Sequence, residues 1–169
     1  MIQVSLDTSF LISFADPNRA HHAIAVDYFR HCLAQRIPMW ISVIAAGEFE
    51  VKQPVSDLQL QYFRIQPYNL PHAIRAAALL RSLQAANSQP FENDARRIVI
   101  NDLKIIAQAE EEKISVVLTE DANTLAKIAV RLRQTNAASI RVLLLKDGFT
   151  PGKLETPDQG ELTLPPAAA

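Results

Sequence analysis

The sequence of 169 residues contains a single cysteine, Cys32, and this scarcity limits how the fold is stabilised. One cysteine cannot form an internal disulfide, and nothing in its use indicates an oxidising, extracellular environment. A chain of this length buries a hydrophobic core without cross-links or a structural metal. We therefore expect one folded domain in a reducing, cytoplasmic compartment.

Long apolar runs and an excess of charge of one sign are also absent. No uninterrupted apolar stretch approaches the roughly 18 residues of a membrane span, so no membrane association is expected. The apolar N-terminus carries Asp7 and no basic flank, which indicates a buried strand and not a signal peptide. With 17 basic and 18 acidic residues the formal net charge is −1. Nucleic-acid binding would therefore need a local basic patch or metal ions.

Strand-like and helix-like segments alternate along most of the sequence. Compact apolar runs predict strands at residues 2–6, 115–119 and 140–145, and weaker runs predict strands at 39–43 and 62–66. Helical spacing predicts helices at 19–36, 45–52, 72–86, 94–113 and 124–133. This alternation favours an α/β fold with a mostly parallel, five-stranded sheet flanked by helices on both faces.

The domain is expected to span residues 1–150. From Pro151 the apolar periodicity stops and the sequence becomes rich in proline and polar residues. Such a composition predicts a mobile C-terminal tail over residues 151–169. Residues 85–93 are expected to form a mobile loop.

Two acidic residues follow predicted strands. Asp7 comes directly after the first strand, and Asp121 comes two residues after the fourth. Ligands of open parallel sheets bind beyond the carboxyl ends of the strands, so both side chains are expected at that edge. Asp7 taken alone is equally consistent with the N-cap of a short helix.

Asp102 lies inside the apolar stripe of its predicted helix. The apolar residues three, four or seven positions away are Ile98, Val99, Ile105, Ile106 and Ala109. A buried carboxylate is tolerated when it is paired with a base or coordinates a metal. Arg97 and Lys104 are the available bases, but their spacing from Asp102 places them on other faces of the helix. Asp102 is therefore a candidate metal ligand.

Glu48 completes a set of four acids that are expected to converge on one cleft. It follows Ser42, a natural N-cap, and shares a helix face with Ile44 and Ala45. Clustered carboxylates raise one another's pKa unless cations lie between them, so the cluster implies metal. Oxygen ligands favour Mg²⁺ or Mn²⁺ over zinc. No zinc-like spacing links the histidines, which are expected to be structural or at the surface: His21, His22, His31 and His72.

Four blocks of this sequence resemble the PIN-domain family, whose VapC-like members are the toxins of bacterial toxin–antitoxin pairs. In chain order, the matching blocks read VSLDTSFLIS, ISVIAAGEFE, NDLKIIAQA and VVLTEDANTL. The resemblance implies a parallel sheet flanked by helices and Mg²⁺-dependent hydrolysis of single-stranded or structured RNA. It also implies a cognate antitoxin that blocks the site, and often a homodimer.

The sequence departs from the usual toxin of this family in three ways. The segment 70–101 is long, Asn123 stands where some members have a further acid, and the proline-rich tail is extra. These departures leave open an alternative to the toxin role, which is a free-standing PIN nuclease without an antitoxin.

The candidate residues are expected to act as metal ligands, as hydroxyl groups that orient a water or phosphate, and as contacts to the RNA. Asp7 and Asp102 are expected to ligate the first metal, with Asp121 and Glu48 completing its water shell or holding a second ion. The hydroxyls expected to orient a water or a phosphate oxygen belong to Thr8, Ser9 and Thr119. Asn123 is expected to contact the substrate. The basic side chains expected to carry the RNA backbone, unless they form an ordinary solvated surface, are Lys127, Arg131, Arg133 and Arg141.

Two other classes of protein compete with the nuclease. A receiver-like signalling domain would accept a phosphoryl group on a strand-end aspartate beside Mg²⁺, and Lys146 suits such a domain. Against it, Asp7 has no acidic neighbour, and the third predicted strand ends at Gln66 without an acceptor aspartate. A catalytically inactive binding module is the third class, and the intact set of four acids disfavours it.

Overall fold

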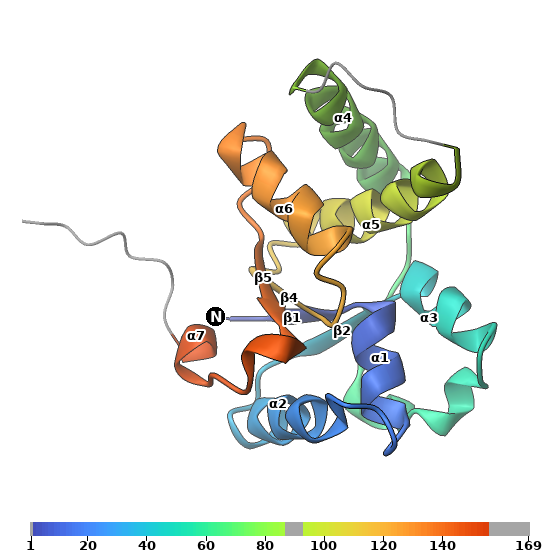
Figure 1. Ribbon diagram of the computed structural model, residues 1–169, viewed down its shortest axis with the longest axis vertical. Helices are drawn as coiled ribbons and strands as arrows, with labels where there is room; N and C mark the ends of the chain where they lie inside the picture. The colour runs from blue at the N-terminus through green and yellow to red at the C-terminus, as the bar shows by residue number, and fades with distance from the viewer. Residues whose placement is uncertain (1, 87–92, 156–169) are drawn as a thin grey trace, which may run out of the picture.

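The computed structural model describes residues 2–86 and 93–155, except for the side chains of residues 93–98 and 155. One sheet of five parallel strands runs through the molecule in the order β3-β2-β1-β4-β5 (Figure 1). The strands are β1 (Val4–Leu6), β2 (Met39–Ser42), β3 (Arg64–Gln66), β4 (Val116–Thr119) and β5 (Arg141–Leu144). The five-stranded parallel sheet predicted from the sequence is confirmed.

Helices cover both faces of this sheet, as the alternating pattern predicted. They are α1 (Thr8–Ala15), α2 (His22–Ala34), α3 (Val43–Glu50), α4 (Leu70–Ala86), α5 (Asn93–Glu111), α6 (Leu125–Gln134) and α7 (Gly152–Glu155). Figure 1 shows α4, α5 and α6 on one side of the sheet and α1, α2 and α7 on the other. Short 3₁₀ turns connect some of these elements: η1 (Val55–Asp57), η2 (Leu60–Tyr62) and η3 (Leu145–Asp147).

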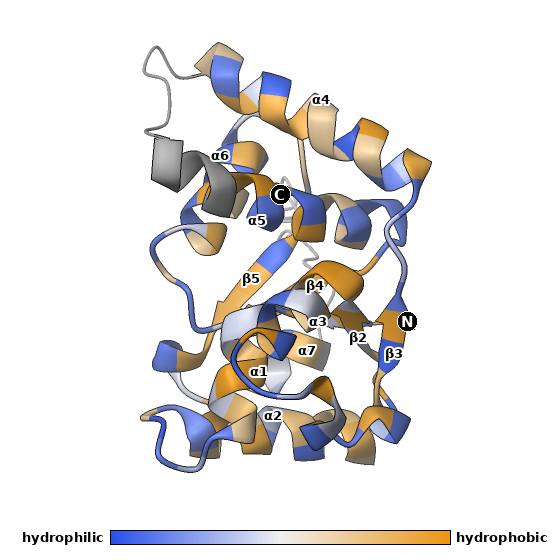
Figure 2. Ribbon diagram, turned by 90° about the vertical axis from the view of Figure 1, so that its right-hand side faces the viewer, coloured by the Kyte–Doolittle hydropathy of each residue, from blue (hydrophilic) through white to orange (hydrophobic). Residues whose placement is uncertain are grey.

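The core forms around the two central strands. The side chains of Leu6 in β1 and Leu118 in β4 are neighbours in register and are fully buried. Continuous apolar runs of this kind are typical of parallel strands with both faces covered. Figure 2 shows β5 as mostly hydrophobic, whereas α4 alternates hydrophobic and hydrophilic residues along its length. Within residues 2–86 and 93–155, no helix combines the length and apolarity needed to cross a membrane.

Two helices begin directly at the carboxyl ends of strands because capping side chains stand there. The Asp7 carboxylate accepts a hydrogen bond from the Ser9 backbone N–H at 3.3 Å, which caps α1. The Ser42 hydroxyl accepts one from the Ile44 backbone N–H at 3.0 Å, which caps α3. Such caps satisfy backbone donors that the first helical turn leaves unpaired. Because the caps lie at the sheet edge, Thr8 and Glu48 are carried to the same rim.

The C-terminal boundary of the domain differs from the prediction. Residues 152–155 form α7, which packs on the domain through Leu154, a side chain that is only 1% exposed. Just before it, Gly148 adopts a φ of 81°, which glycine tolerates without strain, and the Phe149 ring meets Tyr28 edge to face at 5.0 Å. A one-turn helix is too short to show an apolar period, so no sequence pattern predicted it. The rest of the expected tail, residues 156–169, and residues 87–92 of the expected loop lie outside the described part.

We predict that Leu154→Ala lowers the free energy of unfolding by about 2 to 4 kcal/mol, because it empties a buried site. Denaturant unfolding followed by circular dichroism measures this difference. The matched control is Lys153→Ala on the exposed side of the same turn, which should change stability by less than about 0.5 kcal/mol. Equal stability of both variants would mean that α7 does not hold the domain in solution.

Candidate active site

Asp7 caps α1 and also contributes its carboxylate to the candidate site. Its side chain is 5% exposed, and its Oδ2 atom accepts hydrogen bonds from Ser9 Oγ and Thr119 Oγ1, each at 2.8 Å. Burial raises the pKa of Asp7, although the hydrogen bonds from Ser9 and Thr119 act in the opposite direction. The two interpretations of Asp7 left open by the sequence, cap and site residue, are therefore compatible.

Glu48 joins α3 to two other helices. Its Oε2 atom accepts a hydrogen bond from Thr8 Oγ1 at 2.5 Å, and its Oε1 atom accepts one from Asn101 Nδ2 at 2.6 Å. These short bonds fix the carboxylate between α1 and α5. Asn101 precedes Asp102 in α5, so its hydrogen bond to Glu48 holds the Glu48 carboxylate close to Asp102.

Asp102 is the most unusual group of the site. It is 8% exposed, and its Oδ2 atom is fully buried without a hydrogen-bond partner among the described residues. Burial is the largest cause that raises the pKa of Asp102 to about 7. The negative charges of Asp7, Asp121 and Glu48 raise it further, against a hydrogen bond from the Thr124 side chain.

No base neutralises Asp102 within the described part of the chain. The ion pairs found there involve Glu110, Glu112 and Glu120. Lys104, one of the two bases considered from the sequence, instead places its Nζ atom 5.9 Å from the centre of the Tyr68 ring. The side chain of the other, Arg97, lies outside the description.

Asp121 organises the loop between β4 and α6. Its Oδ1 atom accepts backbone hydrogen bonds from Asn123 at 2.8 Å and Thr124 at 2.9 Å, and its Oδ2 atom accepts one from the Thr124 hydroxyl. Partial burial acts to raise the pKa of Asp121, but these hydrogen bonds outweigh it and the pKa is lowered. Asp121 therefore keeps its charge beside Asp102.

The four acids meet at one cavity of about 280 Å³. Its nine lining residues are Asp7, Thr8, Ser9, Ile12, Glu48, Lys52, Asn101, Asp102 and Asp121. The acids come from the end of β1, from α3, from α5 and from the loop after β4. The structure thus brings together the four acids that the sequence singled out, with Thr8 and Ser9 among them.

Other predicted residues stand elsewhere. Thr119 is fully buried, and its hydroxyl binds Asp7 and accepts the Asp121 backbone N–H at 2.9 Å, so it positions acids and does not face the cavity. Asn123 is exposed and is not part of the lining. Arg141 begins β5, at the sheet edge opposite the acids. These placements depend on loop geometry and strand direction, which the composition of a segment does not reveal.

The histidines at positions 21 and 72 have structural partners, as expected. His21 Nδ1 lies 2.8 Å from Glu120 Oε1, and His72 Nε2 lies 3.0 Å from Glu112 Oε1. Neither lines the acidic cavity.

Four residues near the acids were not singled out from the sequence: Lys52, Asn101, Glu120 and Thr124. The first two line the cavity, and in the sequence only their positions close to Glu48 and Asp102 pointed to them. Lys52 follows Glu48 by one helical turn, and Asn101 is adjacent to Asp102. The Thr124 hydroxyl donates a hydrogen bond to Asp121, three residues earlier, and such local bonds are common for aspartate in turns.

Glu120 anchors the loop that carries Asp121. Its Oε2 atom accepts hydrogen bonds from the Ser13 hydroxyl and, at 3.0 Å, from Arg19, while its Oε1 atom contacts His21. Partial burial acts to raise the pKa of Glu120, but these hydrogen bonds and the Arg19 charge lower it to about 2. A charged Glu120 therefore fastens the β4–α6 loop to α1 and to the turn after it.

The donor set suits a hard divalent cation. In the described part of the chain, no group of three or more His, Cys, Asp or Glu side chains is already arranged as a metal site. Each carboxylate oxygen has about two acceptor positions, however, so oxygens that accept one hydrogen bond can still coordinate a cation. The buried, unpartnered Oδ2 atom of Asp102 is the group that such a cation would satisfy.

This arrangement defines a parallel α/β domain with an acidic cavity at the carboxyl edge of its sheet. The model of the PIN domain matches residues 4–131, so the chain belongs to the PIN-domain family. A comparison with curated proteins gives no significant match.

Solved structures with a similar fold are VapC-type toxins and their complexes. VapBC2 from Rickettsia felis, bound to promoter DNA, has a TM-score of 0.55 and 16% identity, covering 84% of this chain and 98% of that one. VapC20 from Mycobacterium tuberculosis, a toxin that cleaves the sarcin–ricin loop, has a TM-score of 0.51 and 15% identity, covering 74% and 95%. DNA-bound VapBC from Salmonella typhimurium has a TM-score of 0.51 and 20% identity, covering 86% and 99%. At these identities the likeness establishes the fold.

We predict that Asp102→Asn stabilises the metal-free protein at high pH. A carboxyl whose pKa is 3.8 when unfolded and about 7 when folded keeps its proton longer in the folded state, so its contribution to stability falls as the pH rises between these values. Asparagine carries no titratable proton, so the variant does not lose stability over this pH range. Denaturant unfolding in EDTA should show a gain on the order of 1 kcal/mol or more at pH 8 and little difference near pH 4.

The matched control is Glu111→Gln, which removes an exposed acid near the end of the same helix. A different outcome would identify Asp102 as the partner of a base, because a stranded buried base destabilises a protein by roughly 3 kcal/mol or more. A loss of that size at pH 8 would therefore contradict the site described above.

Proposed function

We propose that this PIN-domain protein is a metal-dependent endoribonuclease that hydrolyses RNA phosphodiester bonds at the acidic cavity. The observation that carries the proposal is Asp102, a buried carboxylate beside three further acids, with one oxygen that has no partner among the described residues. Clustered carboxylates repel one another, and a bound cation would compensate this repulsion. Membership of the PIN-domain family and a neighbour described as a loop-cleaving toxin support RNA as the substrate.

In this proposal the four acids act as metal ligands in two pairs. Asp7 and Asp102 would hold the first Mg²⁺ or Mn²⁺, with Asp121 and Glu48 completing its water shell or holding a second ion. A bound divalent cation supplies charge neutralisation at the phosphate and lowers the pKa of water. The hydroxyl of Ser9 keeps Asp7 oriented, as Asn101 does for Glu48, so that the carboxylates are in place before substrate arrives.

Among the described residues that line the cavity, Lys52 is the one basic residue. Its side chain is exposed and forms no ion pair within the described part of the chain. We assign it the task of contacting the scissile phosphate, whose negative charge would otherwise be repelled by the surrounding carboxylates.

RNA cleavage by the purified protein is expected to require Mg²⁺ or Mn²⁺ and to stop in excess EDTA. A labelled single-stranded RNA separated on a denaturing gel measures this, and Asp102→Asn should show no cleavage under either condition. Glu111→Gln serves as the active control. Undiminished cleavage in EDTA would rule out the metal mechanism.

Lys52→Met should raise KM for RNA about tenfold or more and lower kcat less, since the lost charge mainly binds the phosphate. Steady-state cleavage at saturating Mg²⁺ separates the two constants. Lys52→Arg should restore most of the binding. An unchanged KM in the Met variant would show that Lys52 does not meet the substrate.

The finer proposal is that the nuclease is the toxin of a toxin–antitoxin pair, acting on cytoplasmic RNA and forming a homodimer. Two of the similar structures are VapBC complexes, which supports an antitoxin as partner. The alternative is a free-standing PIN nuclease. A small antitoxin-like reading frame next to the gene, whose product blocks RNA cleavage when co-purified, would separate these two functions.

A receiver-like function finds no support in the geometry. Flavodoxin-like signalling domains use the strand order 2-1-3-4-5, whereas this sheet has the order β3-β2-β1-β4-β5. The third strand is therefore at the edge, and it ends in the buried Gln66, whose amide donates to the Gln108 carbonyl at 3.4 Å. No acceptor aspartate stands there.

A further inference from the structure

A second hollow lies on α6, next to the acidic cavity but separate from it. Its volume is about 350 Å³, and its lining consists of Ala122, Ala126, Lys127, Val130, Arg131 and Gln134. We call these six residues the α6 groove. Its described lining contains two cationic side chains and no acidic one, in a protein whose net charge is −1.

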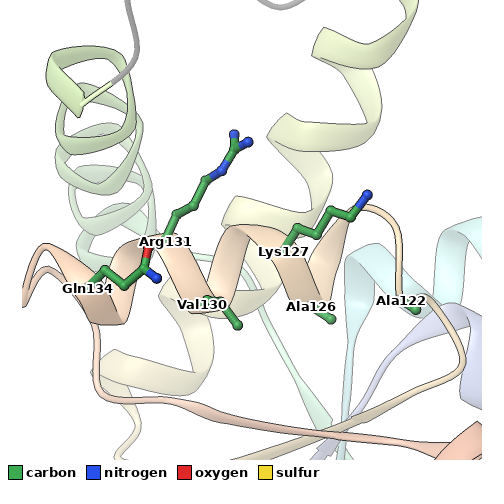
Figure 3. A pocket seen from close by; sticks show the side chains of 6 residues that line it. All are labelled: Ala122, Ala126, Lys127, Val130, Arg131 and Gln134. Carbon is green, nitrogen blue, oxygen red and sulfur yellow. The ribbon is translucent and has the colours of Figure 1, made fainter.

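The groove has a charged side and an apolar side. Figure 3 shows Lys127 and Arg131 extending together from α6, while Ala126 and Val130 point to another side of the helix. Lys127 and Arg131 are one turn apart, a separation of roughly 6 Å along the axis. Among the described residues neither forms an ion pair, and Val130 is 53% exposed although it is apolar.

The groove is continuous in the chain with the site. Ala122, at one end of the groove, directly follows Asp121, which lines the cavity. An endonuclease substrate extends beyond the phosphate that is cut, so its strand must leave the cavity across a neighbouring surface. The cationic residues that line the groove on α6 are Lys127 and, one turn further along the helix, Arg131.

We infer that the α6 groove binds the single-stranded RNA next to the scissile phosphate. Lys127 and Arg131 contact two successive backbone phosphates, and the exposed Val130 side chain lies against a ribose or base. The inference rests on the proposed function for the identity of the strand, and it goes beyond it by assigning the surface that carries the substrate.

Charge favours RNA over a protein partner at this position. Phosphates carry one negative charge per nucleotide, and two cations one turn apart on α6 complement them. The other basic residues considered from the sequence do not share the groove, because Arg133 is not in its lining and Arg141 lies at the opposite edge of the sheet. Of the four basic residues proposed to contact the RNA backbone, two therefore line the groove.

The test is the salt dependence of RNA binding by the full chain. Binding of a short labelled single-stranded RNA is measured by fluorescence anisotropy in EDTA, which prevents cleavage, over a range of salt concentrations. The slope of log K against log salt changes by about 0.7 for each phosphate contact to a single strand. Lys127→Gln with Arg131→Gln should flatten the slope by about 1.4 and weaken binding about tenfold near physiological salt.

The matched control removes the same two charges elsewhere, by Arg30→Gln with Lys153→Gln on exposed positions of α2 and α7. It should leave the slope unchanged. The single variants Lys127→Gln and Arg131→Gln should each flatten the slope by about 0.7, which keeps the test valid if the double variant does not fold.

Other outcomes would overturn the inference. They are an unchanged slope in the α6 variants, an equal change in the control, or no RNA binding by the unmodified protein. A loss of dimer mass in light scattering with unchanged RNA binding would assign the groove to a protein interface instead. Groove-dependent binding without any cleavage would support the inference and contradict only the proposed nuclease function.

Discussion

The mutual repulsion of carboxylates at the edge of the sheet is the constraint around which this structure is arranged. Asp102 is nearly inaccessible to water and lies beside three other acids, and one of its oxygens has no partner in the part of the chain that the structure describes. Holding charges together in this way costs free energy, which the packed layers on both faces of the sheet must offset. A divalent cation bound between the carboxylates would neutralise their charge and remove this cost.

The polar network around the acids explains how they stay in place. Thr119 and Ser9 hold Asp7, while Asn101 holds Glu48, so that each carboxylate is oriented by a different element. Glu120 fastens the β4–α6 loop to α1. These partners are buried or half-buried, and hydrogen bonds in such surroundings fix geometry more strongly than bonds on the surface.

Deeper in the same layer, α5 is anchored to the sheet by a second set of polar contacts. The Gln108 side chain accepts a hydrogen bond from the Ser42 hydroxyl at the end of β2, and it donates to the Gln66 carbonyl at 3.3 Å beside β3. Buried amides are stable only when they are satisfied, so these bonds fix how α5 crosses the sheet edge. Asp102, six residues earlier in the helix, is thereby aimed at the cavity.

The sequence by itself determined the parallel sheet, the helices on its two faces and the four acids, because apolar runs and an acid inside an apolar stripe are local signals. Only the tertiary structure decided that Thr119 faces Asp7, that Lys52 enters the cavity and that Arg141 lies at the opposite edge. It also decided that Leu154 joins the core, since one helical turn has too few residues to show a period. Strand order and the directions of side chains arise from contacts between distant segments, and no pattern within a single segment encodes them.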